Sequence, residues 1–287
     1  MLNYDKVLNY KFDPIEQSYT IRDTMLYALG LGLSKDPLNR DELKFTFEKN
    51  LQALPTMAVV LCRPSVWYKE PDLGIDFVKL LHGEQSLTVR RPIPPEATII
   101  GQNKVTKIID KGEGKGALLY IDRELFDKAS GDSIAVMTHT LVLRGNGGFS
   151  GGGGPKVDVP KPHAMPERPA DMTAECAIDP RAALIYRLSG DDNPIHADPD
   201  LAIKAGFPKP IFHGLGTFGM AIFEIIKHVC KYQAEQLTAF DLRFSSPVYP
   251  GETFRTEIWI DGKTAFFRCT AVERNVKIVD NGRALLS

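Results

Sequence analysis

A polar segment in the second half of the chain, Tyr186 to Pro199, contains the residue types used in acid–base chemistry. Asp191 and His196 lie five residues apart. Gly190 before them and Asn193-Pro194 between them favour turns. The turns allow the carboxylate and the imidazole to converge. A carboxylate and an imidazole that share one water molecule form a general acid–base pair that works near neutral pH. We interpret the two residues as such a pair; turn-capping and core roles are the alternative.

Two other acidic residues of this segment have structural interpretations. Asp198 precedes Pro199, a pattern that predicts a helix N-cap with proline at the first helical position. Asp192 is interpreted as a solvated turn residue. Neither is needed to explain acid–base chemistry.

A glycine-rich stretch follows at Gly214, Gly216 and Gly219, spaced as in a dinucleotide-binding loop. The context does not fit, because Pro208 and Pro210 occupy the place of the buried strand that should precede it. We instead predict a helix N-terminus whose exposed N–H groups at and after Gly214 stabilise developing negative charge, as in an oxyanion hole. Close packing of the helix against a sheet is a second reason for small residues here.

The elements that position these residues are predicted from hydrophobic spacing. Helices are expected at residues 20–31 and 215–232, and the second is apolar nearly all round, so it should be buried. Segments rich in β-forming residues are 105–110, 117–122, 134–143, 254–260, 265–272 and 276–280. Residues 111–116 and 261–263 suit hairpin turns. A buried helix followed by antiparallel strands predicts an α+β fold.

The two halves of the chain resemble each other. Residues 91–99 align without gaps to 246–254, and Leu87 to Val89 fall opposite Leu242 to Phe244 at the same offset. Between the halves lies a glycine- and proline-rich stretch that is costly to order inside an element. We therefore predict two domains, 1–145 and 170–287, that arose by duplication and are joined by a linker at 146–169.

Composition excludes several classes of protein. The chain has 287 residues with 35 Lys and Arg against 36 Asp and Glu, and this balance argues against nucleic acid as a partner. There is no apolar run of membrane-spanning length and no secretory signal, so no membrane partner is expected. Four widely spaced cysteines favour neither disulfides nor a zinc site. The C-terminal residues are not a Ser-Lys-Leu peroxisomal address, and we expect a cytoplasmic protein.

The motifs resemble a known family. Tyr-x-Leu-Ser-Gly-Asp-x-Asn-Pro-x-His at 186–196, followed by Ala-Gly-Phe-x-x-Pro-Ile-x-His-Gly-Leu at 205–215, is similar to the signature of (R)-specific 2-enoyl-CoA hydratases type 2. These are MaoC-like proteins and the hydratase part of peroxisomal multifunctional enzyme type 2. The resemblance extends over the chain through Tyr19 to Asp23, Leu26 to Gly30, Leu81 to Gln85 and Pro247 to Gly251.

The resemblance implies a double hot-dog fold, two antiparallel sheets each wrapped around a central helix. It implies that the N-terminal half forms the acyl tunnel without catalysing the reaction, and that the C-terminal half carries the hydratase motif. Catalytic roles fall on Asp191, His196, Asn193 and Gly214, with Asn193 helping to hold the water. Substrate contacts fall on His82, Gly83, Lys111, Asp192, Pro194, Ile195 and Phe244.

The activity expected from the resemblance is reversible hydration of a trans-2-enoyl-CoA to a (3R)-3-hydroxyacyl-CoA in fatty-acid metabolism. No cofactor or metal is expected, the partner is the acyl-CoA substrate, and the protein is expected to be a homodimer. Two alternatives are a 3-hydroxyacyl-carrier-protein dehydratase and a non-catalytic acyl-thioester-binding protein, although the second has no reason to keep Asp191, Asn193 and His196 together. A peroxisomal location is the alternative if the chain belongs to a larger or separately targeted protein.

Overall fold

The computed structural model describes residues 1–150 and 161–287 of the chain. The α-helices are α1 (Tyr4–Leu8), α2 (Ile21–Gly30), α3 (Ala182–Tyr186), α4 (Pro199–Lys204) and α5 (Gly214–His228). The strands are β1 (Ile15–Tyr19), β2 (Leu80–Val89), β3 (Ala97–Asp110), β4 (Ala117–Asp127), β5 (Ser133–Leu143), β6 (Met172–Ala177), β7 (Leu237–Phe244), β8 (Thr253–Asp261), β9 (Thr264–Ala271) and β10 (Val276–Leu286). Short 3₁₀ helices are η1 (Glu42–Phe45), η2 (Pro55–Val60), η3 (Trp67–Lys69), η4 (Pro71–Leu73), η5 (Phe77–Lys79), η6 (Arg187–Ser189), η7 (Pro194–His196) and η8 (Ala234–Gln236).

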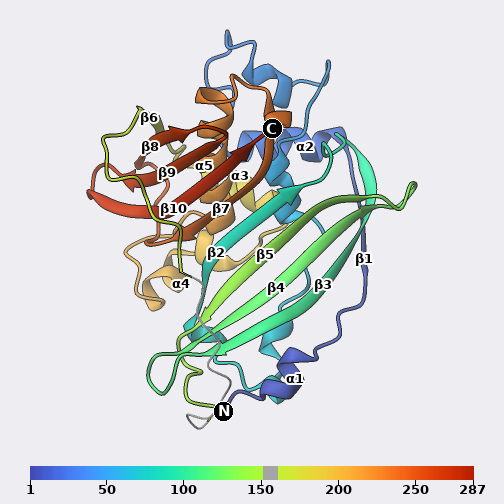
Figure 1. Cartoon of the computed structure of the whole chain (residues 1–287), viewed down its shortest axis with the longest axis vertical. Coiled ribbons are helices and arrows are strands. Elements are labelled where there is room, and N and C mark those ends of the chain that lie inside the picture. Colours follow the sequence, from blue (N-terminus) through green and yellow to red (C-terminus); the bar gives the residue numbers. More distant parts are fainter. Residues whose placement is uncertain (151–160) are drawn as a thin grey trace.

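The strands of the described chain form one antiparallel sheet in the order β1-β3-β4-β5-β2-β7-β10-β9-β8-β6 (Figure 1). Read outward from the centre, the five strands of each half follow the same order, so the topology supports duplication and confirms the α+β double hot-dog class. The expectation of two sheets needs refinement. Pairing of β2 with β7, from Glu84↔Arg243 to Thr88↔Ala239, joins the two half-sheets into one.

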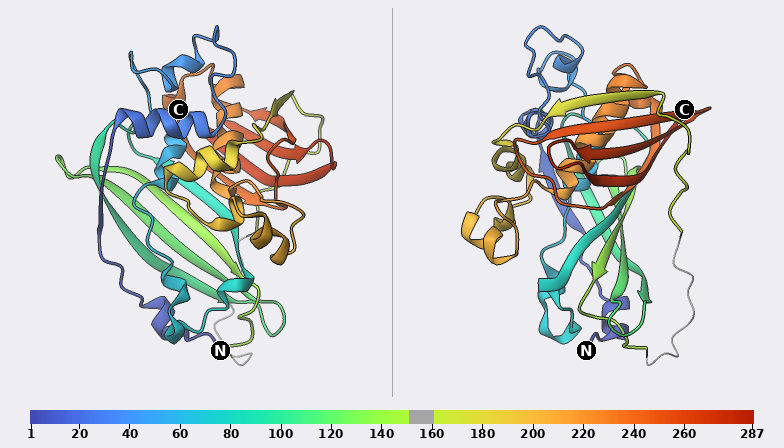
Figure 2. Two further views of the ribbon diagram at one scale, coloured as in Figure 1. Left: turned by 180° about the vertical axis from the view of Figure 1, so that it is seen from behind. Right: turned by 90° about the vertical axis from the view of Figure 1, so that its left-hand side faces the viewer.

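Helices lie on one face of this sheet, as the view from behind shows (Figure 2). The longest is α5, which packs against β7, β8 and η2. Its residues from Leu215 to Ile226 are all buried, as predicted from their apolar character. The helix ends at His228, before the predicted residue 232, because Lys231 and Tyr232 adopt positive φ values of 50° and 62°.

The first half has no counterpart of α5 in length. The corresponding position, before β2, is taken by the six-residue η2, which is completely buried and begins at Pro55. The predicted helix of this half is α2, which starts with a capping box of Thr20 and Asp23. It packs against α3 of the second half, and a Cβ at Gly30 would lie 3.1 Å from the backbone of Tyr186. Helix α2 thus joins the halves instead of filling the first half-sheet.

The predicted strands are present, and several are longer than expected. β3 begins at Ala97 and β10 continues to Leu286, because polar residues alternate with buried ones along both. Four strands were not predicted: β1, β2, β6 and β7. Strands β1 and β6 are short edge strands in which few residues are buried, whereas β2 and β7 pair with each other at the centre of the sheet. The predicted hairpins are confirmed, with glycines of positive φ at Gly112, Gly116 and Gly262.

Part of the predicted linker at 146–169 lies outside the described residues. Its beginning is attached to the first half: Asn146 donates to the carbonyl of Gly74, and Ser150 donates to Asp110. Farther on, His163 accepts a hydrogen bond from Asn281 through its backbone carbonyl. The described ends of the linker therefore each contact the half to which they are adjacent.

Candidate active site

Turns bring Asp191 and His196 together as the sequence predicts. Gly190 adopts a φ of 102° and ends η6, which directs the chain into the loop that carries Asp191. Asn193 then caps η7, where its side chain accepts from the backbone N–H of Ile195 at 3.3 Å, and His196 ends this 3₁₀ turn. The predicted N-cap at Asp198 is confirmed, because its carboxylate accepts from two backbone N–H groups of α4.

Three side chains form the polar centre of the site: Asp191, His196 and His213. One nitrogen of each histidine and one carboxylate oxygen lie within 4.8 Å of one another. The two imidazole rings stack with centroids 3.7 Å apart. Two hydrogen bonds made by one water molecule span about 4.6 Å. The spacing therefore suits a single water held between the carboxylate and an imidazole, and we call these three residues the acid–base cluster.

Backbone carbonyls determine which ring nitrogen carries the proton. Nδ1 of His196 lies 2.9 Å from the carbonyl oxygen of Ile211, which can only accept, so Nδ1 is the protonated nitrogen and Nε2 keeps its lone pair. Nε2 of His213 likewise donates to the carbonyl of Asp191 at 3.0 Å. Nδ1 of His213 is buried without a hydrogen-bond partner. His196 thus offers Nε2 as a proton acceptor.

Burial keeps both histidines neutral. It lowers the pKa of His196 and lowers that of His213 to about 3. Burial alone would raise the pKa of Asp191, but the positive charge of Arg63 beside it lowers this pKa. The cluster therefore combines an ionised carboxylate with two neutral imidazoles, and it holds proton acceptors near neutral pH.

The N-terminus of α5 begins beside this cluster. His213 is the N-cap of the helix, Gly214 is its first residue, and no side chain caps it. A Cβ at Gly214 would meet only Phe244, at 3.8 Å, whereas a Cβ at Gly216 would lie 2.4 Å from the ring of Phe212. Gly216 is therefore a packing residue, which explains the glycine spacing without a dinucleotide. The Gly214 backbone is accessible for a ligand to approach.

First-half residues reach the same region from β2. The ring of His82 lies 5.0 Å from that of Phe244, and its Nε2 donates to the carbonyl of Glu84 at 3.0 Å. Burial, together with the charge of Arg63, lowers the pKa of His82 to about 4. Gly83 lies in a bulge of β2, and a Cβ there would be 2.7 Å from Val142. Packing against β5 therefore explains this glycine independently of any substrate contact.

The remaining predicted site residues differ in position. Asp192, Asn193 and Pro194 are exposed and Ile195 is partly buried, all in the loop that carries the cluster. Lys111 lies apart from them. It is exposed in the turn after β3, and β4 and β5 separate that strand from β2, about 14 Å away at 4.8 Å per strand.

Two residues of the site were not predicted as functional. His213 stands beside Gly214 in the motif, but its side chain was given no role. Arg63 comes from the first half, and its Nη1 lies 2.8 Å from Oδ2 of Asp191. No local pattern marks Arg63, because the contact joins segments far apart in the sequence.

The acid–base cluster has enough donors to be considered as a metal site. However, the guanidinium of Arg63 already pairs with the carboxylate, and a second cation there would be repelled. Two ring nitrogens are also engaged by backbone carbonyls. The donor set therefore fits water better than a metal ion, and we assign no metal ligands.

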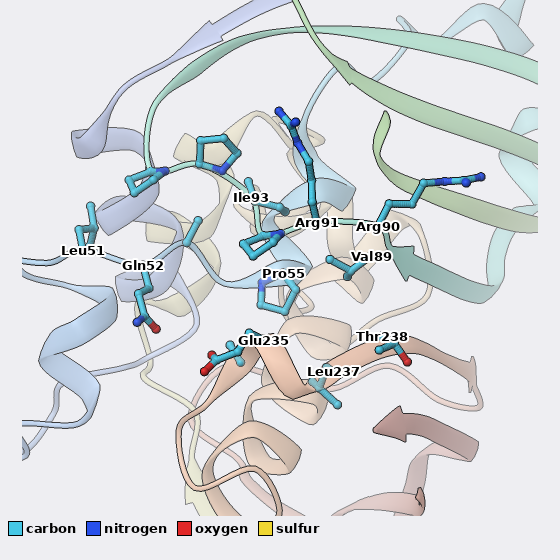
Figure 3. A pocket seen from close by; sticks show the side chains of 15 residues that line it. Leu51, Gln52, Pro55, Val89, Arg90, Arg91, Ile93, Glu235, Leu237 and Thr238 are labelled. Carbon is cyan, nitrogen blue, oxygen red and sulfur yellow. The ribbon is translucent and has the colours of Figure 1, made fainter. Parts of the chain in front are cut away.

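A pocket of about 510 Å³ lies away from this cluster, at the C-terminal side of α5 (Figure 3). Residues from both halves line it, including Pro55, Val89 and Ile93 from the first half and Leu237 from the second. It shares no residue with the cluster. Because Pro55 begins η2 and Arg63 follows it, the pocket and the cluster lie at opposite ends of this segment.

Comparisons with known proteins match both halves. A family model described as the MFE-2 hydratase 2 N-terminal domain matches residues 17–145, and one described as a MaoC-like domain matches residues 161–281. The peroxisomal enoyl-CoA hydratase 2 of Arabidopsis thaliana is 37% identical over 290 residues, which cover 96% of this chain and 93% of that protein.

Two further proteins are similar along nearly the whole chain. Peroxisomal multifunctional enzyme type 2 of Mus musculus is 33% identical over 280 residues, covering 96% of this chain and 37% of that protein. The crystal structure of a MaoC-like dehydratase from Phytophthora capsici has 32% identity and a TM-score of 0.86, and covers 100% of this chain and 99% of that one.

Proposed function

The chain belongs to the hydratase 2 family of MaoC-like proteins, and from this membership we propose that it is a hydro-lyase that adds water to trans-2-enoyl-CoA. The product is a (3R)-3-hydroxyacyl-CoA, and the reaction is reversible. The observation that carries the proposal is the acid–base cluster at the N-terminus of α5. An ionised carboxylate and a neutral imidazole one water apart are what this reaction requires.

The mechanism uses one water molecule. The water donates one hydrogen bond to Asp191 and one to Nε2 of His196, which leaves an oxygen lone pair directed at C3 of the enoyl group. As the C3–O bond forms, a proton passes to the cluster, and the electrons of the C2–C3 double bond move toward the thioester oxygen. The N–H of Gly214 stabilises the negative charge on that oxygen. The proton then returns to C2, so the reaction balances without a metal or redox cofactor.

We also propose substrate contacts for the residues that the resemblance implies. Phe244 and His82 border the space in front of Gly214 and would contact the thioester. Asp192, Pro194 and Ile195 would line the same loop, where Asn193 helps to hold the water. Lys111, on its separate turn, would contact a remote, charged part of coenzyme A. We place the acyl chain in the first half, among residues between Leu54 and Leu81.

Location and assembly also belong to the proposal. No helix of the described residues is long and apolar enough to cross a membrane. We propose a cytoplasmic location, and a peroxisomal location is the alternative because two relatives are named as peroxisomal. We keep the homodimer as a proposal, with its test in the mass of the purified protein in solution.

The test is a hydration assay with crotonyl-CoA and a decenoyl-CoA, followed by chiral analysis of the product. We expect loss of the enoyl thioester absorbance and a product of (3R) configuration. The same acyl groups on a carrier protein serve as the comparison. No hydration of either CoA thioester, or a (3S) product, would overturn the proposal.

A further inference from the structure

We propose that Arg63, contributed by the first half, is a positioning residue that holds the carboxylate of Asp191 ionised and oriented for the reaction. The inference rests on the proposed function and assigns part of the active site to the half that carries no hydratase motif. Its basis is the contact between the two side chains across the boundary between the halves.

The contact is a partly buried charge pair. Nη1 of Arg63 lies 2.8 Å from Oδ2 of Asp191, and the side chains are 33% and 14% exposed. Both the charge of Arg63 and its side-chain hydrogen bond lower the pKa of the Asp191 carboxyl group. Within residues 1–150 and 161–287, Arg63 is the cation that pairs with this carboxylate. The orientation of Asp191 therefore depends on where Arg63 is held.

The backbone before Arg63 is fixed by a second, deeply buried arginine. Arg123 is 3% exposed, and its Nη1 donates to the carbonyls of Val59 and Leu61 at 3.2 and 2.8 Å. Its Nε donates to Asn103 at 3.0 Å. The buried guanidinium of Arg123 is thus hydrogen-bonded to backbone carbonyls, where a carboxylate would be the usual partner. Arg123 anchors the C-terminal end of η2, from which Arg63 extends.

A further contact fixes the residue between these anchors and Arg63. Cys62 has a φ of 50°, an unusual conformation for a residue with a side chain, and its N–H donates to Gln17 at 2.6 Å. Pro64 follows Arg63 and restricts its backbone. The guanidinium is therefore presented to the second half by a constrained backbone.

The surroundings explain what the positive charge does. The titratable and charged groups around the Asp191–Arg63 pair come from several elements: Tyr68 in η3, His82 on β2, Arg123 on β4, His139 on β5, Tyr186 in α3, Arg187 in η6, His196 in η7 and His213 before α5. After burial, the charge of Arg63 contributes to lowering the pKa of all four histidines. One cation therefore favours both the ionised carboxylate and the neutral imidazoles.

This arrangement divides the work within the acid–base cluster. The guanidinium makes the Asp191 carboxylate a weaker base, so that it accepts a hydrogen bond from water and orients it. Nε2 of His196 has no such partner and takes the proton. Arg63 touches neither water nor substrate in this assignment and acts only through Asp191.

The experiment compares pH–rate profiles for crotonyl-CoA hydration by the wild type, Arg63→Gln and Arg63→Lys. The control is Arg255→Gln, which removes an arginine that pairs with Glu175 on the far edge of the sheet. In Arg63→Gln, we expect the acidic limb of kcat/KM to move up by about one pH unit. We expect kcat to fall about tenfold at pH 7, with KM within about twofold of the wild-type value. Arg63→Lys and the control should keep the wild-type limb.

Other results would overturn the inference. A uniform loss of activity at all pH values would make Arg63 a structural residue, and a raised KM with an unmoved limb would make it a substrate-binding residue. Circular dichroism could show that Arg63→Gln and Arg63→Met both fail to fold while Arg63→Lys folds. If the acidic limb of kcat/KM were then shifted in Arg63→Lys, the positive charge at this position would not set that limb, and the inference would be wrong. If both neutral variants and Arg63→Lys all failed to fold, Arg63 would serve folding instead.

A second readout does not depend on activity. In ¹⁵N-histidine NMR, protonation of His196 and His213 should occur at higher pH in Arg63→Gln than in the wild type. Unchanged histidine titration would overturn the inference. If the wild type failed to hydrate either CoA thioester while the titration shifted as expected, the proposed reaction would be wrong and the role of Arg63 in setting charge would stand.

Discussion

Single residues of the acid–base cluster owe their protonation states to their surroundings. Aspartate and histidine differ in pKa by more than two units in water. In this site burial keeps the imidazoles neutral, and the guanidinium of Arg63 keeps the carboxylate ionised. The carboxylate of Asp191 and the imidazole of His196 therefore both accept hydrogen bonds from one water molecule. An exposed histidine, in contrast, is partly protonated to the cation near neutral pH.

Removing either acceptor should stop most of the reaction. Asp191→Asn and His196→Gln should each lower kcat by at least about a hundredfold with the fold retained, the scale expected for a positioned acid or base. The double variant should be scarcely slower than the single ones, because both residues act on one water. Steady-state hydration assays and circular dichroism measure both. Near-wild-type activity in either single variant would contradict the assignment.

The buried histidines should also make stability depend on pH. His213 and His139 are almost completely buried, and burial lowers the pKa of each below 6.5. Below about pH 6.5 the unfolded chain binds protons that the folded chain does not, so the free energy of unfolding falls as pH decreases. Each such histidine should contribute a loss of about 1–2 kcal/mol by pH 5.

Urea unfolding between pH 7.5 and 5 measures this effect. His139→Gln should flatten the dependence, because it removes one group that must stay neutral in the fold. The comparison variant is His163→Gln, since the side chain of His163 is 40% exposed, although it lies 3.3 Å from Asp241. A flat profile for the wild type would contradict the neutral buried state.

Helix α5 joins two requirements in one element, a packed surface and an open N-terminus. Gly216 and Gly219 allow contact with Phe212 and with Leu31, because a Cβ at either position would lie under 3 Å from these side chains. Gly214 faces Phe244 with room for a Cβ. The same residue type therefore serves stability at two positions and the proposed oxyanion hole at the third.

Substitutions at these glycines should separate the two requirements. Gly214→Val should lower kcat by about a hundredfold, as loss of an oxyanion-hole donor does, because the side chain displaces the thioester oxygen. Its melting temperature should stay near that of the wild type. Gly216→Ala should instead lower the melting temperature, since Phe212 must move. A change in KM alone for Gly214→Val would make Gly214 a binding or packing residue.

The sequence predicted the elements better than their connections. The α5 pattern, the Asp198 cap and the hairpin glycines are local signals, and each was confirmed. Edge strand β1, the reduced η2 and the β2–β7 pairing depend on distant partners that no local window contains. In the site, the turn around Gly190 predicted the approach of Asp191 to His196. The contact with Arg63 could not be predicted, because it depends on how the halves pack.

At the scale of the molecule, each half covers surface of the other. Residues of η2 and the end of α2 lie against α5, and β7 pairs with β2. Separation would uncover apolar residues of α5 together with unpaired backbone groups of a strand, both of which favour association.

Residues 156–287 expressed alone should therefore be insoluble or self-associated. If soluble, the fragment should be at least a dimer, because a second copy can pair with the free edge of β7. It should also lose activity, since Arg63 and His82 are absent. Size-exclusion chromatography with light scattering and a crotonyl-CoA assay measure these outcomes. A monomeric, fully active fragment would show that the first half is dispensable.

The β2–β7 pairing also determines how destabilising substitutions in either half affect the whole molecule. Because this pairing lies at the middle of one continuous sheet, opening it removes the partner strand from both halves at once. We therefore expect the two halves to fold as one cooperative unit and not as two independent modules. A destabilising substitution in the half without the acid–base pair should then lower the population of folded, active molecules as much as an equally destabilising one beside Asp191. Natural selection on the reaction therefore acts on the core of both halves.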